Sequence, residues 1–293
     1  MNWQKKLKGK VKILEPLSRH TTFKIGGRAE FFIEPRDTSD LKLLITQAKR
    51  YRMPVLVIGA GSNILVSDKG IKAIVLHLNS PFFKRASYGR NYLEVGSGLM
   101  LGQLILDAKN HGLSGLESLA GIPGTVGGAL VMNAGAWGRN IADAVQRVSV
   151  MDCHGKIKTL AKRKIKFGYR KSSLARYIIL SARLRLAKKN KKEINASIKK
   201  SLEYRRTAQD VSAPNAGCIF KNPLGKSAGR LIDLCGLKGE KIGGACVSER
   251  HANFILNQDN ASSDDVLKLI SLIKERVKGK FRVTLEPEIK IWG

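Results

Sequence analysis

The glycine-rich segment between residues 121 and 138 constrains this chain more than any other. It reads GIPGTVGGALVMNAGAWG and contains six glycines, one proline and no charged side chain. Glycine costs backbone entropy in a packed core, so this density predicts places where the main chain turns through positive φ or lies against a ligand. Without lysine or arginine, backbone N–H groups are expected to meet an anionic cofactor. The alternative interpretation is a pair of ordinary turns flanking a buried helix.

The 293 residues are 43% hydrophobic, which is enough for a full core in two or three domains. No stretch reaches the roughly twenty apolar residues of a membrane span, so we expect a cytoplasmic protein without membrane insertion. The four cysteines are Cys153, Cys218, Cys235 and Cys246. They form no CxxC pair, which argues against a structural zinc site or other bound metal, and most are expected to be core thiols.

The formal net charge of +30 suggests a nucleic-acid-binding protein at first. However, the basic residues are spread along the chain, and the densest run, at 188–192, is short. No zinc-finger spacing or RNA-recognition aromatic motif accompanies them. A small anionic substrate is the better expectation, because a positive field concentrates diphosphates and carboxylates near clefts. The sequence gives no indication of an oligomeric state.

The first two thirds of the chain predict alternating strands and helices. Leu41, Leu44, Ile45 and Ala48 recur at helical spacing within 38–52, which predicts an amphipathic helix. Short apolar runs bounded by turn residues predict strands at 55–59, 73–78, 92–95, 145–152 and 177–186, with a second helix at 101–111. This pattern is typical of two α+β units.

A third α+β unit is expected in the last third. A connecting helix over 188–208 would bury Ile194, Ile198 and Leu202 on one face. We expect a helix at 227–237 and strands at 245–247 and 253–256. A second helix is expected to be capped by Ser262 or Ser263 and to end at Gly279; its apolar stripe is Val266, Leu269, Ile270, Ile273 and Val277. The final strand, at 283–293, is expected to return to an earlier sheet.

The common nucleotide-binding motifs are incomplete. GAGSNI at 59–64 has Ile64 where a Rossmann fingerprint needs its third glycine, and GSGLML at 96–101 fails in the same way. GKS at 225–227 resembles the end of a P-loop, but Phe220 occupies the position of the first glycine. Neither kind of site is predicted.

Six separated motifs together resemble one family. They are HTTFKIGG (20–27), GAGSN (59–63), the glycine-rich segment, FGYR (167–170), NAGCIFKNP (215–223) and LEPEIKIWG (285–293). In this order they resemble the UDP-N-acetylenolpyruvoylglucosamine reductases. The resemblance implies an FAD enzyme of peptidoglycan precursor synthesis, which uses NADPH to reduce the enolpyruvyl ether of UDP-N-acetylglucosamine-enolpyruvate to UDP-N-acetylmuramate.

The resemblance also implies an α+β fold, with a vanillyl-alcohol-oxidase-type FAD-binding module of two α+β subdomains and a C-terminal α+β substrate-binding domain. The subdomains would span 1–82 and 83–190, the substrate domain 191–282, and a C-terminal strand, 283–293, would return to the active site. The chain resembles the shorter form of the family, which lacks a substrate-covering tyrosine loop.

By the same resemblance, two loops would hold the FAD. Small hydroxyls and backbone N–H groups satisfy phosphate oxygens while permitting close approach. The loop along the diphosphate would be Gly59, Gly61, Ser62 and Asn63, and the second wall would be Gly121, Ile122, Gly124, Thr125 and Gly128.

Three residues match the family's catalytic positions. Arg170 would hold the substrate carboxylate as enolate charge develops, since a guanidinium binds a carboxylate in a fork. Glu288 would assist enolate formation; strand alternation places Glu286 on the same face, and only the family pattern selects Glu288. Cys218 stands where many members have serine and would protonate the α-carbon, because a thiol with a reference pKa of about 8.5 is mostly protonated at neutral pH.

Tyr169, Lys221 and Asn222 resemble the family's contacts to the UDP-sugar. Arg205 and Arg206 are weaker candidates, because a solvated helix end explains them equally well. Two other functions stay open at this point: a related flavin oxidase acting on another alcohol, and a basic nucleic-acid-binding protein without flavin.

Overall fold

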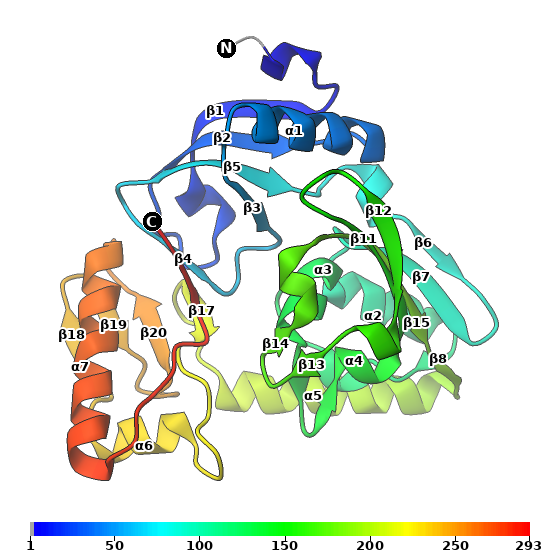
Figure 1. Cartoon of the computed structure of the whole chain (residues 1–293). Helices are drawn as coiled ribbons and strands as arrows, with labels where there is room; N and C mark the ends of the chain where they lie inside the picture. The colour runs from blue at the N-terminus through cyan, green and yellow to red at the C-terminus, as the bar shows by residue number, and fades with distance from the viewer. Residues whose placement is uncertain (1–2) are drawn as a thin grey trace. The chain divides into compact units, whose positions relative to one another are not determined.

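The computed structural model describes residues 3–293, which divide into two compact units (Figure 1). Unit 1 comprises the chain up to Ile13 together with Phe31–Ala60 and Ala73–Arg205. Unit 2 comprises Leu14–Glu30, Gly61–Lys72 and Arg206–Gly293. The GAGSN motif is therefore divided, because Gly59 belongs to unit 1 and Gly61 to unit 2.

An antiparallel sheet in the order β12-β11-β15-β7-β6 organises much of unit 1. Its strands are β6 (Ala86–Tyr88), β7 (Tyr92–Gly96), β11 (Val145–Met151), β12 (Ile157–Ala161) and β15 (Ile178–Arg185). Leu93 and Val148 of this sheet share a buried cluster with Leu104 of α2 (Leu101–Asn110) and Leu130 of α3 (Val126–Met132). Both helices thus bury apolar residues in the same cluster as the sheet.

Short elements complete this part of unit 1, and two-residue strands pair antiparallel as β10 with β9, β13 with β14 and β16 with β8. They are β8 (Leu113–Ser114), β9 (Gly135–Ala136), β10 (Arg139–Asn140), α4 (Ile141–Ala144), β13 (Phe167–Gly168), β14 (Lys171–Ser172), β16 (Ala187–Lys188), and the 3-10 helices η3 (Pro81–Lys84), η4 (Glu117–Leu119), η5 (Lys162–Lys164) and η6 (Ser173–Arg176).

A second sheet has the order β1-β2-β5-β3. Its strands are β1 (Lys10–Pro16), β2 (Arg28–Glu34), β3 (Val55–Ile58) and β5 (Ile71–His77), with η1 (Trp3–Lys6), η2 (Leu17–His20) and α1 (Thr38–Arg50) nearby in the chain. β3 and β5 run parallel, and Leu76 of β5 shares a buried cluster with Leu41 and Leu44 of α1. β2, α1 and β3 follow one another in the strand–helix–strand order expected from the sequence, whereas the connection between the parallel strands β3 and β5, residues 59–70, contains β4 and no helix.

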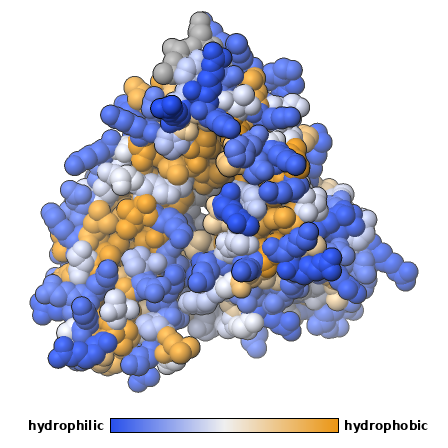
Figure 2. All heavy atoms as spheres, in the orientation of Figure 1, coloured by the Kyte–Doolittle hydropathy of each residue, from blue (hydrophilic) through white to orange (hydrophobic). Residues whose placement is uncertain are grey.

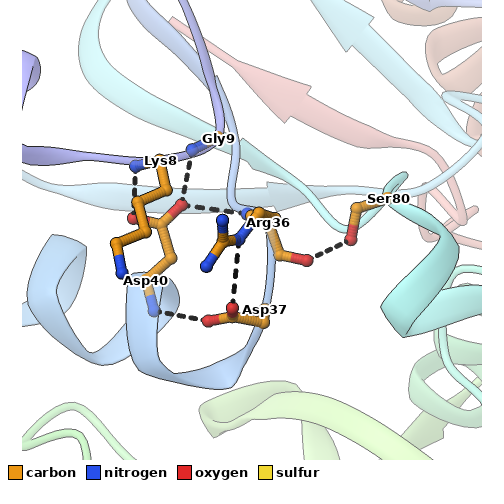
Figure 3. A network of polar contacts seen from close by, with 6 residues as sticks. All are labelled: Lys8, Gly9, Arg36, Asp37, Asp40 and Ser80. Atoms are coloured by element: carbon orange, nitrogen blue, oxygen red, sulfur yellow. Dashed lines mark hydrogen bonds and ion pairs between the residues drawn. The ribbon is translucent and has the colours of Figure 1, made fainter.

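The buried carboxylate of Asp40 ties the N-terminal segment to α1 (Figure 3). Its two oxygens accept the backbone N–H groups of Lys8 at 2.9 Å, Gly9 at 2.8 Å and Arg36 at 2.9 Å. The neighbouring Asp37 caps α1 by accepting the N–H of Asp40 at 2.9 Å. A buried carboxylate is tolerated here because backbone donors satisfy it.

Unit 2 is built on an antiparallel sheet in the order β17-β20-β19-β18 and two helices. Its elements are β4 (Ile64–Val66), β17 (Asn215–Cys218), α6 (Ala228–Leu234), β18 (Lys241–Ile242), β19 (Ala245–Val247), β20 (Phe254–Asn257), α7 (Ser263–Phe281) and β21 (Lys290–Trp292). Ile255 of β20, Ile232 of α6 and Leu269 of α7 share one buried cluster. The predicted stripe of α7 is buried as expected.

Two predicted helical features are wrong. α7 continues past Gly279 to Phe281 and ends where Arg282 adopts a left-handed conformation with φ 57. The helix α5 (Lys191–Ala208) buries Ile194 and Ile198, but Leu202 is 45% exposed. Leu202 lies instead against Gly121, where a built Cβ would come within 3.1 Å of its Cδ2 atom.

The cysteines and the end of the chain also differ from expectation. Only Cys246 is buried, whereas Cys218 and Cys235 are half-buried and Cys153 is exposed, so most are not core thiols. The expected strand at 283–293 is reduced to β21, which pairs parallel with β4. Pro287 accounts for part of this, because it cannot donate a ladder hydrogen bond and makes only one isolated bridge, with Phe220.

Hydrophilic side chains cover much of the face shown in Figure 2, with smaller apolar patches between them. Among residues 3–293, no helix is both long and apolar enough to cross a membrane.

Candidate active site

The glycine-rich segment contains both a buried helix and the strained turns that a ligand loop needs. α3 begins after its N-cap Thr125, whose Oγ1 accepts the N–H of Gly128 at 3.2 Å. Before it, Gly121 and Gly124 have φ values of +78° and +155°, which L side chains rarely adopt. The buried helix flanked by turns and the positive-φ glycines are thus both present, and contact with a ligand stays a prediction.

Glycine is also needed where this segment meets its neighbours in unit 1. A Cβ on Gly59 would lie 2.6 Å from Thr125 Oγ1, and one on Gly127 would lie 3.1 Å from Ser97 Cβ. The loop after β3 and the start of α3 therefore approach each other more closely than alanine would permit. The structure thus brings Gly59 and Thr125 together, although 66 positions separate them in the chain.

The N–H groups at the start of α3 already have hydrogen-bond acceptors within unit 1. Those of Val126, Gly127 and Gly128 donate to Leu99 O, to Ser97 O and to the capping Thr125. Within residues 3–293, the N–H groups of Gly121 and Gly124 make no hydrogen bond. The donors available to an anion therefore lie in the loop before the helix.

Ser97 is a site candidate that the sequence reasoning missed. Its side chain is 3% exposed, and its Oγ has no hydrogen-bond partner among the described residues. A buried hydroxyl without a partner is uncommon and indicates a group that a ligand or an ordered water satisfies. The Ser97 hydroxyl and the N–H groups of Gly121 and Gly124 are donors of the kind that phosphate oxygens accept. Ser97 is the second residue of GSGLML, whose small residues are the sequence signal for this position.

The second half of the GAGSN motif is fixed within unit 2. Gly61 has φ +64°, and a Cβ there would overlap the carbonyl oxygen of His20. Ser62 is half-buried, and Asn63 Nδ2 donates to Glu288 O at 3.2 Å. The main chain of Asn63 also accepts from Lys290 N at 3.0 Å. This motif therefore orders the terminal segment in addition to its predicted role beside the cofactor.

Unit 2 brings Cys218 and Glu288 onto adjacent segments. The N–H of Glu288 donates to the carbonyl of Ile219, which follows Cys218, at 2.7 Å. β17, which ends at Cys218, is itself paired with β20, where Cys218 faces Phe254. The thiol and the carboxylate are both half-buried. Segments 70 positions apart in the chain are thereby held side by side by backbone hydrogen bonds.

The competing glutamate has a different environment. Glu286 is 74% exposed at its side chain, and its Oε2 lies 2.9 Å from Lys221 Nζ. The Lys221 N–H also donates to Glu286 O at 2.9 Å. Glu286 is thus an exposed ion-pair partner of Lys221, whereas the half-buried Glu288 adjoins the Cys218 segment.

Asn222 has a structural contact. Its Oδ1 accepts the N–H of Ala228, the first residue of α6, at 3.0 Å. This hydrogen bond orders the loop between Pro223 and Ser227. Asn222 therefore has a structural role in addition to its predicted contact with the substrate.

Arg170 is fixed by the main chain of the glycine-rich segment. It lies at the turn between β13 and β14 with φ 54, and its Nη1 donates to Gly135 O at 2.9 Å. Its guanidinium carbon lies 5.3 Å from the ring centroid of Tyr169, which is 51% exposed. Arg170 belongs to unit 1, whereas Cys218 and Glu288 belong to unit 2.

Arg205 has a clear contact that the sequence did not indicate. Its Nε donates to Ala120 O at 2.9 Å, and its Cδ lies 2.7 Å from the Cβ position of Gly121. It therefore buttresses the loop before α3 rather than forming a solvated helix end.

Comparison with known proteins agrees with this arrangement. Residues 209–292 match the C-terminal domain of UDP-N-acetylenolpyruvoylglucosamine reductase, and residues 29–161 match an FAD binding domain. A reductase of this name from Geotalea uraniireducens is 43% identical over 98% of this chain and 95% of its own length. UDP-N-acetylenolpyruvoylglucosamine reductase 2 of Symbiobacterium thermophilum is 41% identical over 97% and 93%.

A solved structure shows the same fold. The UDP-N-acetylenolpyruvylglucosamine reductase of Thermus caldophilus superposes with a TM-score of 0.83 at 36% sequence identity, covering 98% of this chain and 100% of that one. The expected FAD-binding module with a C-terminal domain is thereby confirmed. The chain belongs to the UDP-N-acetylenolpyruvoylglucosamine reductase family.

Proposed function

We propose that this protein reduces UDP-N-acetylglucosamine-enolpyruvate to UDP-N-acetylmuramate with NADPH, as an FAD enzyme of cytoplasmic peptidoglycan precursor synthesis. Its membership of the reductase family supports the overall reaction. The observation that carries the site assignment is the hydrogen bond from Glu288 N to Ile219 O at 2.7 Å, which holds an acidic side chain and the Cys218 thiol on adjacent segments.

The residues that would hold the FAD are the two predicted loops, extended by Ser97. Flavin, when bound, supplies the hydride for the substrate. The N–H groups of Gly121 and Gly124 and the Ser97 hydroxyl are donors suited to its diphosphate. The other proposed contacts are Gly59, Gly61, Ser62, Asn63, Ile122, Thr125 and Gly128, of which Gly59 and Gly61 admit no larger side chain.

Three side chains would carry the substrate chemistry. As the terminal methylene of the enolpyruvyl group accepts hydride, charge develops on its carboxylate, and Arg170 would stabilise that charge as a permanent cation. Glu288 would assist enolate formation by polarisation or proton supply. The Cys218 thiol would then give its proton to the α-carbon, which completes the D-lactyl ether.

The remaining assignments rest on the family resemblance. Tyr169, Lys221 and Asn222 would contact the UDP-sugar, and the chain would work as FAD subdomains at 1–82 and 83–190, a substrate domain at 191–282 and the terminal strand at 283–293. The same resemblance supports the proposal that this chain is of the family's shorter form, which lacks a substrate-covering tyrosine loop.

Anaerobic half-reactions test the function. NADPH should bleach the bound flavin, and UDP-N-acetylglucosamine-enolpyruvate should restore its colour with formation of UDP-N-acetylmuramate. Cys218→Ser should keep this second step and Cys218→Ala should lose it. A preparation without flavin, or reduced flavin that reoxidises in air but not with the substrate, would refute the proposal; the second result would indicate an oxidase instead.

A further inference from the structure

Asn133 connects three segments of unit 1 through its side chain. It is the C-cap of α3, with φ 45 and ψ 55, and is 6% exposed. Its Nδ2 donates to Gly168 O at 3.0 Å, and its Oδ1 accepts from Ala142 N at 3.3 Å. Asparagine suits this position because it tolerates a left-handed backbone and offers both a donor and an acceptor.

The partner at Gly168 lies in the hairpin that carries Arg170. Gly168 pairs with Lys171, so the two residues enclosed between them are Tyr169 and Arg170. Arg170 takes a left-handed φ of 54, and its Nη1 donates to Gly135 O, two residues beyond Asn133. The Asn133 amide thus holds the hairpin at Gly168, and the main-chain carbonyl of Gly135 holds the Arg170 guanidinium.

Ser172 makes a second connection between the hairpin and α3. Its Oγ lies 2.9 Å from Leu130 O and 3.0 Å from Val131 O, in the last turn of the helix. Two side chains, Asn133 and Ser172, therefore attach the hairpin to the carboxyl end of α3, whose N-cap Thr125 is one of the proposed flavin contacts.

We propose that Asn133, together with Ser172, is a positioning residue for Arg170, because the two side chains fix the hairpin that carries the guanidinium to the carboxyl end of α3. The inference rests on the proposed function, in which Arg170 holds the substrate carboxylate. A misplacement of about 1 Å in such a contact costs about 100-fold in rate. A buried amide that fixes the turn beside the arginine is therefore expected to affect substrate reduction without contacting the substrate.

Asn133→Gly is the most direct variant, because glycine adopts the left-handed conformation without strain and removes both hydrogen bonds. We expect substrate-dependent reoxidation of the flavin to slow at least tenfold, while flavin content and the rate of flavin reduction by NADPH change less than twofold. The matched control is Asp40→Ala, which removes a buried acceptor of three backbone N–H groups in a network without hairpin residues. It should lower stability but leave the ratio of the two half-reaction rates unchanged.

A double-mutant cycle with Arg170→Ala then separates positioning from general structure. If Asn133 acts through Arg170, Asn133→Gly should slow reoxidation less than twofold in the Arg170→Ala background. A full tenfold effect there, or equal slowing of both half-reactions in the single variant, would overturn the proposal.

Ser172→Ala keeps the test valid if Asn133→Gly does not fold. It should slow reoxidation selectively by at least threefold, and a wild-type ratio of half-reaction rates in this variant would overturn the proposal. Failure of the wild-type enzyme to be reoxidised by substrate would instead refute the proposed function, so the two failures are distinguishable.

Discussion

Gly61 shows how a single position can be decided by backbone geometry. Its φ of +64° and the carbonyl of His20, which occupies the space of a Cβ, both exclude a side chain. A left-handed conformation costs an L-residue about 1–2 kcal/mol before any overlap is counted. Gly61→Ala should therefore displace the GAGSN loop and lower both stability and flavin content.

The control for this substitution is Gly102→Ala. Gly102 lies in α2, where nothing comes within 4 Å of an added Cβ, and alanine in a helix is favoured by about 1 kcal/mol. The ratio of flavin to protein absorbance and urea unfolding would compare the two variants. Equal flavin content in both would show that the loop does not need Gly61.

Residue roles were predictable from the sequence only where a motif identified them. Arg170, Cys218 and Glu288 came from the family resemblance, and their assignments stay proposals. Nothing in the local sequence distinguished Glu288 from Glu286; the difference in exposure and the Lys221 ion pair of Glu286 arise from tertiary packing. Ser97 and Asn133 were missed because their importance lies in a buried hydroxyl and a buried amide contact, which no short pattern encodes.

At the scale of the element, α7 has the most complete local signals. Ser262 Oγ accepts Asp265 N at 3.1 Å, and Asp265 Oδ2 accepts Ser262 N at 3.0 Å, so the predicted cap is a full capping box. Ser262→Ala should cost about 1 kcal/mol of unfolding free energy. Ser271→Ala, on the exposed part of the same helix, is the control and should change stability little. Urea unfolding would measure both.

The contribution of this capping box to stability is expected to depend on pH. The Ser262 N–H bond holds the pKa of Asp265 below its ordinary value of 3.8, despite the opposing effect of burial. A lowered folded-state pKa adds stability that is present above the unfolded-state value and is lost as pH falls through the folded-state value. The stability advantage of wild type over Asp265→Asn should therefore shrink below pH 3.8. A constant difference between pH 7 and about pH 2.5 would contradict this assignment.

Element boundaries were less predictable than element types. α7 passes Gly279 because a glycine ends a helix only when its backbone turns left-handed, and here Arg282 does so instead. Pro287, which cannot donate a ladder hydrogen bond, accounts for part of the shortening of the terminal strand. The position of the left-handed turn is not specified by the local pattern, whereas the proline that shortens the strand is already present in the sequence.

For the whole molecule, the +30 net charge is the dominant electrostatic fact. Both proposed substrates are polyanions, and a positive field increases their encounter rate. Raising ionic strength from about 10 mM to 150 mM shortens the Debye length from about 30 Å to about 8 Å. We expect kcat/KM for both substrates to fall several-fold while kcat changes little, with sucrose at matched viscosity as the control. A flat salt dependence would show that the charge has another role.

The sequence by itself determined the family, the α+β class and the capped, amphipathic helices, because these follow from motif order, hydrophobic periodicity and local hydrogen bonds. Tertiary structure decided which glutamate is half-buried beside the Cys218 segment, which glycines cannot carry a Cβ, and how Asn133 and Ser172 hold the Arg170 hairpin. These depend on contacts between segments far apart in the chain, and no local pattern specifies such distances.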